Sequence, residues 1–212
     1  MDADRLPASQ PALFATGDVL LFEDAEGGIR YRPSLVDAAT AARWFESLHR
    51  EAGWRVLQRQ MYERIVDVPR LIASYGLDSP QLPVPVVEAL AAVRAVVDAP
   101  FDSVGLNLYR DGRDSVAPHN DTLHALAPGQ PIALLSLGDV RDMVITPKPG
   151  TRGRRIRLPL EPGSLLVMSH ASQSTHDHGV PKTRDAVGPR ISLAFRVRLP
   201  GSDLLRGYRP AS

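Results

Sequence analysis

The feature that most constrains the fold is a succession of short apolar or alternating runs in the second half of the chain, separated by Gly and Pro. These runs read SVGLNLY, IALLSLG, DMVIT, IRLPL, SLLVM and ISLAFRVR. Runs of this length between turn residues are typical of the short strands of a sandwich or barrel. The first half instead has apolar residues at helical spacing in 34–52 and 84–100. We expect Ser34 as the N-cap of the first helix, with Asp37 in its first turn.

Helices followed by strands predict an α+β domain whose core is a double-stranded β-helix (jelly roll) buttressed by the N-terminal helices. The 212 residues suit a single domain, because Pro and Gly are spread as turns and do not gather in a linker. Within 1–212 we distinguish an N-terminal extension and helix over 1–54, a middle region over 55–100 and the jelly-roll core over 101–198.

The alternation within two of the strands predicts which polar side chains share a face. In SVGLNLY the aliphatic residues alternate with Asn107 and Tyr109, so these two side chains point to the same side. In RISLAFRVR the apolar odd positions leave Arg190, Ser192 and Arg196 on the opposite face. A solvated outer face of the sheet is the alternative for either strand taken alone.

Histidine and aspartate side chains with the spacing of metal ligands follow the first of these strands. His119 and Asp121 form an H-x-D pair, whose side chains project from one face if the segment is extended. The later stretch SHASQSTHDHGVP offers His170, His176 and His178 as a third ligand. Two histidines and one carboxylate leave open positions that suit Fe(II) binding an oxidant and dioxygen, although zinc and manganese remain possible.

Arg190 and Arg196 then follow in R-x5-R spacing, and a buried guanidinium is well suited to hold one end of a dicarboxylate. The motifs N-x-Y, H-x-D, distant His and R-x5-R occur in this order in NLYRDGRDSVAPHND, IALLSLGDVRDMVI, GSLLVMSHASQSTHDHGVP and PRISLAFR. With MYERIVDVPRLIASYG upstream, these stretches resemble the AlkB family of Fe(II)- and 2-oxoglutarate-dependent dioxygenases, most closely its nucleic-acid-repair branch. The resemblance covers roughly residues 55–198.

The resemblance implies an enzyme that couples oxidation of 2-oxoglutarate by dioxygen to hydroxylation of an alkyl group on a base, so that an N-methyl group leaves as formaldehyde. It implies Fe(II) bound by His119, Asp121 and His178, with His178 preferred over His176 because it directly precedes GVP. The residues that it implies for 2-oxoglutarate are Asn107, Tyr109, Arg190 at the far carboxylate, Ser192, and Arg196 nearer the keto-acid end. A dioxygenase acting on a protein or small molecule, or a silent jelly-roll binding module with an accidental H-x-D, are the alternative functions.

For the substrate, the resemblance implies a base flipped into the pocket and a hairpin around residues 61–63 that wedges into the vacated stack. The residues expected to contact nucleic acid are Tyr62, Arg70, Leu123, Arg141 and Asp142. Tyr62 is equally compatible with an edge-strand position. The chain departs from the family at LDSPQLPVPV, which lacks an aromatic-rich stretch, and at Leu123, where the family tends to place an acid. We therefore expect a preference for neutral or apolar adducts such as etheno bases, or a substrate other than damaged DNA.

Charge is unevenly distributed along the chain. From Arg141 onward there are thirteen basic and five acidic residues, against twelve basic and nineteen acidic residues before it. A basic second half favours alkylated DNA or RNA as the partner, and Arg152, Arg154 and Arg155 could track a phosphate backbone, although a mixed solvated surface is the alternative. The sequence has no cysteine and no apolar run of membrane-spanning length, so we expect a cytoplasmic monomer that does not bind membranes.

Overall fold

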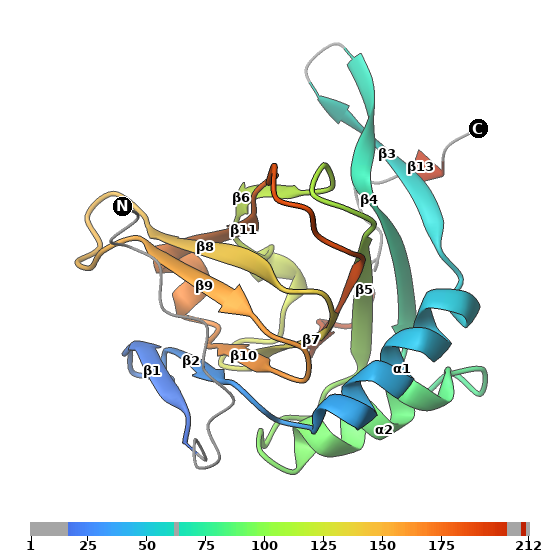
Figure 1. Cartoon of the computed structure of the whole chain (residues 1–212). Coiled ribbons are helices and arrows are strands. Elements are labelled where there is room, and N and C mark those ends of the chain that lie inside the picture. The colour runs from blue at the N-terminus through green and yellow to red at the C-terminus, as the bar shows by residue number, and fades with distance from the viewer. Residues whose placement is uncertain (1–16, 62–63, 203–208, 211–212) are drawn as a thin grey trace.

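The computed structural model of the chain describes residues 17–61, 64–202 and 209–210, and the strands of these ranges form two sheets (Figure 1). The larger sheet runs, in spatial order, β1 (Val19–Phe22), β2 (Ile29–Arg32), β10 (Leu165–Met168), β7 (Ile132–Gly138), β12 (Arg190–Arg196), β5 (Ser103–Tyr109), β4 (Arg64–Gly76), β3 (Arg55–Met61) and β13 (Arg209–Pro210). The smaller sheet runs β6 (Val116–His119), β11 (His176–Val180), β8 (Arg141–Pro147) and β9 (Ile156–Leu160). Neighbouring strands pair antiparallel, which is the arrangement of the expected jelly roll.

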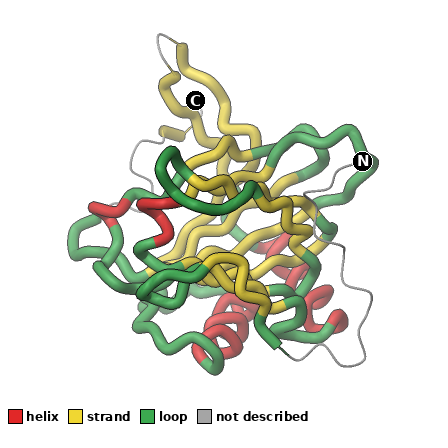
Figure 2. The backbone as a smooth tube through the Cα atoms, turned by 90° about the vertical axis from the view of Figure 1, so that its left-hand side faces the viewer, coloured by secondary structure: helices red, strands yellow, loops and turns green. Residues whose placement is uncertain are grey.

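Two helices, α1 (Ala38–Glu51) and α2 (Val84–Arg94), cover the outer face of the larger sheet. Figures 1 and 2 show the two helices side by side on the same side of the molecule. Their buried residues Trp44, Leu48 and Val86 pack in one cluster with Leu106 of β5 and Leu193 of β12. The expectation that helices buttress a sheet is therefore confirmed. Among the helices of the described ranges, none has the length and hydropathy needed to cross a membrane.

The first helix begins later than predicted, and the prediction of Ser34 as its N-cap is wrong. Asp37 is the cap, and its carboxylate accepts the Thr40 backbone N–H at 2.7 Å. An anion at this position also meets the positive end of the helix dipole. Ser34 lies outside the helix because the next residue, Leu35, donates its backbone N–H to the Gly163 carbonyl at 2.8 Å. This contact holds the approach to α1 against the larger sheet.

The second helix ends at Arg94, whereas the stretch 84–100 was expected to be helical up to Pro100, which should lie just past its end. Val96 and Val97 both donate their backbone N–H groups to the Val93 carbonyl, at 3.0 and 2.9 Å. The bond from Val96 reaches back three residues and not four, which is the 3₁₀-type tightening of a terminal turn. The helix therefore stops before the proline that was expected to end it.

All six predicted strands are present, as β5, β7, β8, β9, β10 and β12. The larger sheet also includes β1 and β2 from the region 1–54 and β3 and β4 from the region 55–100. The sheet therefore extends across the boundary that was expected at residue 101. The strands β6 and β11 were not predicted. Their sequences VAPH and HDHGV are only four and five residues long and show no alternation of apolar and polar residues.

The space between the two sheets holds the second part of the core and one end of the site. Tyr109 and Ala194 face this space, whereas Leu108 and Leu193 face the helices. The predicted phase of β5 and β12 is therefore confirmed. The joined ends of β3 and β4 project beyond the other strands of the larger sheet as a hairpin, in which Met61 pairs with Arg64 (Figure 1).

Candidate metal centre

A cavity of about 540 Å³ opens between the larger sheet and strands β6 and β11 of the smaller sheet. The predicted site residues that line it are Arg70, Asn107, Tyr109, His119, Asp121, His178, Arg190, Ser192 and Arg196. They come from β4, β5, β6, β11, β12 and the loop after β6. The fold thus brings together the polar strand faces and the H-x-D pair that lie far apart in the sequence.

His119, Asp121 and His178 offer ligand atoms that all lie within 4.8 Å of one another. His119 ends β6 and pairs directly with His178 of β11, and the centroids of the two rings are 4.5 Å apart. Two imidazole nitrogens and one carboxylate oxygen on one side of a metal fit a divalent transition metal such as Fe(II), with other positions left open. The donor set therefore has the chemistry of the expected metal site.

The surroundings favour the metal-binding protonation state of these ligands. His119 Nδ1 lies 2.9 Å from the Ala117 carbonyl, which can only accept, so Nδ1 carries the proton and Nε2 keeps its lone pair. Burial, together with the neighbouring His119, lowers the pKa of His178 to about 4, so this imidazole is neutral at pH 7. Burial alone would raise the pKa of Asp121, but the charge and hydrogen bond of Arg196 lower it well below its usual range. Arg196 Nε lies 2.6 Å from Asp121 Oδ2.

Two side chains that the sequence did not single out hold the loop that carries Asp121. Gln173 is buried, and its Oε1 accepts the Asp121 backbone N–H at 3.0 Å. Lys148 Nζ donates to Asn120 Oδ1 at 2.9 Å and to the Gln173 carbonyl at 2.8 Å. These contacts fix the backbone on both sides of the peptide bond between Asn120 and Asp121. The sequence offers no signal for them beyond the position of Gln173 in the stretch that ends at His178.

Arg190 presents buried hydrogen-bond donors to the same cavity. Its side chain is 0% exposed, and Nη2 donates to Ser136 Oγ at 2.7 Å. Within the described residues, Nε and Nη1 have no hydrogen-bond partner. Burial lowers the pKa of Arg190 to about 10, which still leaves the guanidinium charged at pH 7. A buried cation with unused donors fits a carboxylate ligand, as the predicted role in 2-oxoglutarate binding requires.

The other predicted cosubstrate residues lie around this guanidinium. The Arg190 Cζ atom is 5.4 Å from the centroid of the Tyr109 ring. Asn107 and Ser192 face each other across the pairing of β5 with β12. Arg70 Nε donates to Asn107 Oδ1 at 2.7 Å, which leaves the Asn107 amide NH₂ for another partner. Arg70, which was expected to contact nucleic acid, therefore lies on the cavity wall and orients Asn107.

Three predicted substrate residues do not line the cavity. Leu123 lies half-buried in the turn η1 (Leu123–Ala125), and its neighbour His124 lines the cavity instead. Asp142 Oδ2 accepts from Arg157 Nε at 3.1 Å, on the smaller sheet. Arg141 is buried and donates to backbone carbonyls. A fourth predicted contact, Tyr62, lies outside the described residues.

His176, the alternative to His178, has other neighbours. Its ring lies 4.2 Å from that of Phe22 between centroids, and its Nδ1 lies 2.9 Å from Thr175 Oγ1. It lines a separate cavity of about 330 Å³ beside β1. The geometry therefore groups His178, and not His176, with the H-x-D pair.

Comparisons with known proteins agree with this geometry. Residues 72–196 match the family described as the 2OG-Fe(II) oxygenase superfamily. The DNA oxidative demethylase ALKBH2 of Homo sapiens is 33% identical over 183 residues, which cover 76% of this chain and 70% of the relative. The alpha-ketoglutarate-dependent dioxygenase alkB homolog 3 of Bos taurus is 33% identical over 190 residues, covering 79% and 65%. A prolyl-4-hydroxylase structure from Pseudomonas putida shares the fold, with a TM-score of 0.56, 16% identity, and coverage of 81% of this chain and 93% of that chain.

Proposed function

The chain belongs to the AlkB family of 2OG-Fe(II) oxygenases, and we propose that it uses Fe(II), 2-oxoglutarate and dioxygen to remove alkyl groups from nucleic-acid bases. The observation that carries the proposal is the grouping of His119, Asp121 and His178 beside the buried Arg190 in one cavity. A metal ligand set and a carboxylate-binding cation are the two elements that this chemistry needs from the protein.

His119, Asp121 and His178 would hold the metal. Bound Fe(II) supplies the redox chemistry that couples conversion of 2-oxoglutarate and dioxygen to succinate and carbon dioxide with hydroxylation of the alkyl group. Arg196 keeps the Asp121 carboxylate ionised and oriented through the 2.6 Å contact of its Nε. Gln173 holds the backbone of the same aspartate. These residues fix the ligands before the metal binds, which reduces the cost of ordering the site.

The cosubstrate would lie along β5 and β12. Arg190 would bind the far carboxylate of 2-oxoglutarate with its unused donors, and Arg196 would lie nearer the keto-acid end. Tyr109 and the amide NH₂ of Asn107 would offer further hydrogen-bond donors. Ser192, buried in the same wall, would complete the polar lining.

The charge of the cavity wall supports an uncharged adduct as the preferred lesion. Beyond the cosubstrate residues, Arg70, His124 and Arg198 line the cavity. Among the described lining residues the only carboxylate is that of Asp121, which pairs with Arg196. A cationic base such as 1-methyladenine would meet repulsion without a compensating anion, whereas an etheno base carries no such charge. Leu123, at the position where an acid was expected, supplies no carboxylate either.

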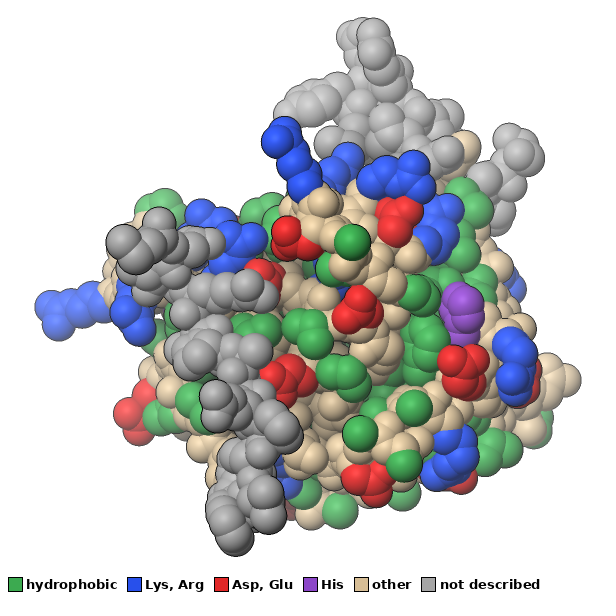
Figure 3. Space-filling model, viewed as in Figure 1, with side chains coloured by type: hydrophobic (Ala, Val, Ile, Leu, Met, Phe, Trp, Pro, Cys, Tyr) green, Lys and Arg blue, Asp and Glu red, His purple; other side chains and the backbone are tan. Residues whose placement is uncertain are grey.

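Nucleic acid would contact exposed basic side chains of the second half of the chain. Exposed Arg152, Arg154 and Arg155 lie at the tip of the β8–β9 hairpin, and Lys and Arg side chains gather over this tip on the face shown in Figure 3. Lys182 and Arg184 are exposed in the loop after β11. Such side chains bind phosphates without reading sequence. We also propose that the protein acts as a monomer and in the cytoplasm.

Anaerobic reconstitution with Fe(II) and 2-oxoglutarate, followed by admission of air, tests the proposed function. Succinate is measured with no oligonucleotide, with an unmodified one and with an alkylated one. We expect succinate formation that the alkylated oligonucleotide stimulates most and that His119→Ala abolishes. No succinate under any condition, or full activity of His119→Ala, would overturn the enzyme assignment. Succinate that nucleic acid never stimulates would favour a protein or small-molecule substrate.

A further inference from the structure

A buried arginine outside the cavity holds together the two strands that carry the metal histidines. Arg141 begins β8 and is 3% exposed. We propose that Arg141 is a positioning residue of the metal centre, whose guanidinium joins the loop before β6 to the end of β11 and thereby sets the spacing of His119 and His178. The inference rests on the proposed function, because it assigns the two histidines to a metal.

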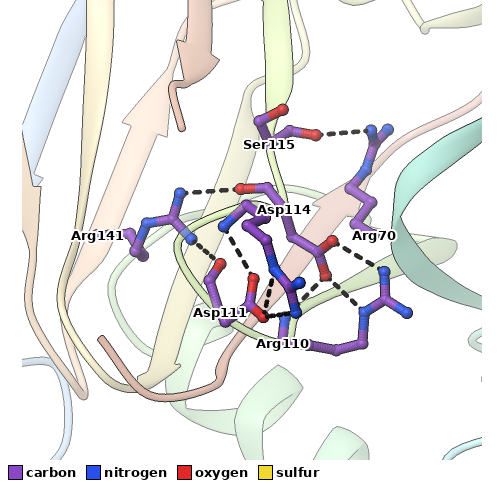
Figure 4. A network of polar contacts seen from close by, with 7 residues as sticks. Arg70, Arg110, Asp111, Asp114, Ser115 and Arg141 are labelled. Atoms are coloured by element: carbon purple, nitrogen blue, oxygen red, sulfur yellow. Dashed lines mark hydrogen bonds and ion pairs between the residues drawn. The ribbon is translucent and has the colours of Figure 1, made fainter. Parts of the chain in front are cut away.

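The guanidinium of Arg141 donates to three backbone carbonyls. Nη1 donates to the Asp111 carbonyl at 2.8 Å, and Nη2 donates to the carbonyls of Asp114 and Pro181 at 2.9 and 2.7 Å. Figure 4 shows the side chain of Arg141 directed at the loop that contains Asp111 and Asp114. One planar group therefore bridges two segments that are 67 residues apart in sequence, from position 114 to position 181.

The bridged carbonyls lie at the open end of the pairing between β6 and β11. Val116, the first residue of β6, pairs with Val180, the last residue of β11. The other registered pair is His119 with His178, and the register shifts between the two pairs. A pairing this short has few hydrogen bonds of its own. Arg141 binds the backbone next to both strands, just before Val116 and just after Val180. It therefore opposes separation of β6 from β11 next to the metal ligands.

Within the described part of the chain, Arg141 acts through backbone carbonyls and forms no ion pair. Asp114, whose carbonyl it binds, has both carboxylate oxygens occupied by Arg110, at 2.8 Å from Nε and 2.9 Å from Nη2. The buried guanidinium thus depends on the three carbonyls for its hydrogen bonds, and the three carbonyls are held in place by the guanidinium. This mutual dependence makes the geometry specific, since a lysine ammonium has no planar fork with which to reproduce it.

Arg141 also contacts the cosubstrate pocket through Tyr109. Its Cζ atom lies 5.7 Å from the centroid of the Tyr109 ring, and Arg190 lies 5.4 Å from the same centroid. Tyr109 and Arg190 are proposed 2-oxoglutarate residues. Removal of the Arg141 guanidinium is therefore expected to weaken the binding of both metal and cosubstrate.

The test compares Arg141→Met and Arg141→Lys with Arg113→Met in the full chain. Arg113 lies in the same loop, but its side chain is 88% exposed and pairs with Asp111. The affinity for Co(II) is measured by titration, and KM for 2-oxoglutarate and kcat are measured separately by succinate formation. We expect about tenfold weaker Co(II) binding and a raised KM in Arg141→Met, and a smaller effect in Arg141→Lys. Arg113→Met should stay within about twofold of the wild type.

If Arg141 contributed only to the stability of the fold, the measurements would give a different result. The melting temperature of the metal-free variants would fall, but Co(II) affinity and KM would stay unchanged when both are measured well below melting, and that result would overturn the inference. If Arg141→Met does not fold, Arg141→Lys carries the same comparison. A wild type that binds Co(II) and variants that bind it equally well would contradict only the role of Arg141. A wild type that binds no Co(II) would contradict the metal site of the proposed function itself.

Discussion

At the scale of the residue, the site depends on a few buried groups whose environment prepares them for ligands. Arg190 is charged, buried and incompletely hydrogen-bonded among the described residues. Such a group destabilises the ligand-free protein and becomes favourable when an anion binds. The alternation of β12 predicted the face that carries Arg190, and the H-x-D spacing predicted His119 and Asp121. They did not predict Gln173 or Lys148, whose contacts exist only once distant loops have met.

Arg190→Met should separate ligand binding from stability. Removal of an unsatisfied buried cation should raise the free energy of unfolding of the ligand-free protein by about 1 kcal/mol or more. The same substitution should raise KM for 2-oxoglutarate at least about tenfold, because the far carboxylate loses its partner. Thermal melting without ligand and succinate kinetics measure the two effects. A less stable variant with unchanged KM would show that Arg190 has a purely structural role.

Gln173→Leu should weaken metal binding although the side chain touches no ligand atom. The substitution leaves the Asp121 backbone N–H without its acceptor, which costs about 1–3 kcal/mol in a buried setting. We expect about tenfold lower Co(II) affinity by titration, with Gln81→Leu on the exposed surface as the control. Equal affinities in both variants would contradict the positioning of Asp121 by Gln173.

At the scale of the element, apolar alternation identified the strands of the larger sheet that carry the cosubstrate residues, and it failed for the two short strands that carry the metal histidines. β5, β7 and β12 could be predicted because their buried faces are continuous. β6 and β11 could not, because VAPH is short and has no alternation, and HDHGV has His, Asp and Gly where apolar residues would signal a strand. The turn η1 was also missed, and it directs His124 into the cavity where the sequence pointed to Leu123. Short turns rotate side chains in ways that strand phase does not describe.

Gly179→Ala should disturb the pairing of β6 with β11. A Cβ at residue 179 would lie 2.9 Å from the Val116 carbonyl oxygen and from the Pro118 nitrogen, so β6 would have to move. We expect a lower melting temperature and weaker Co(II) binding, because His119 ends the displaced strand. Gly53→Ala is the matched control, since its Cβ would have only an ordinary contact at 4.0 Å with the Tyr75 hydroxyl. Co(II) affinity that is unaffected by Gly179→Ala would contradict this account of the strand pair.

At the scale of the whole molecule, two sheets enclose the site and the helices lie on the far side of the larger sheet (Figure 1). This arrangement places α1 and α2 on the face of the larger sheet opposite the cavity and leaves the projecting β3–β4 hairpin beside β5. In the fold, some of the arginines of the basic second half of the chain are exposed at the tip of the β8–β9 hairpin. Composition could indicate a polyanionic partner, but only the fold shows which basic residues share a surface.

Oligonucleotide binding should weaken as salt rises, because binding to phosphates releases counterions. Replacement of Arg154 and Arg155 by Ala should reduce affinity equally for different sequences and make the salt dependence less steep, with the slope falling by about one for each phosphate that the variant no longer binds. Fluorescence anisotropy over a range of salt concentrations measures both quantities, and Arg50→Ala on α1 is the control. An unchanged slope in the double variant would exclude this hairpin from the nucleic-acid surface.

The most direct test of the central claim is mass spectrometry of alkylated oligonucleotides after incubation with the protein, Fe(II), 2-oxoglutarate and air. Matched oligonucleotides carry either an etheno base or an N-methylated cationic base. The account predicts restoration of the unmodified base, dependent on 2-oxoglutarate and absent in His119→Ala, with the etheno base repaired faster. Faster repair of the methylated base would contradict the proposed lesion preference. Adducts that persist in every reaction while the protein binds Fe(II) and 2-oxoglutarate would contradict oxidative dealkylation of nucleic acid.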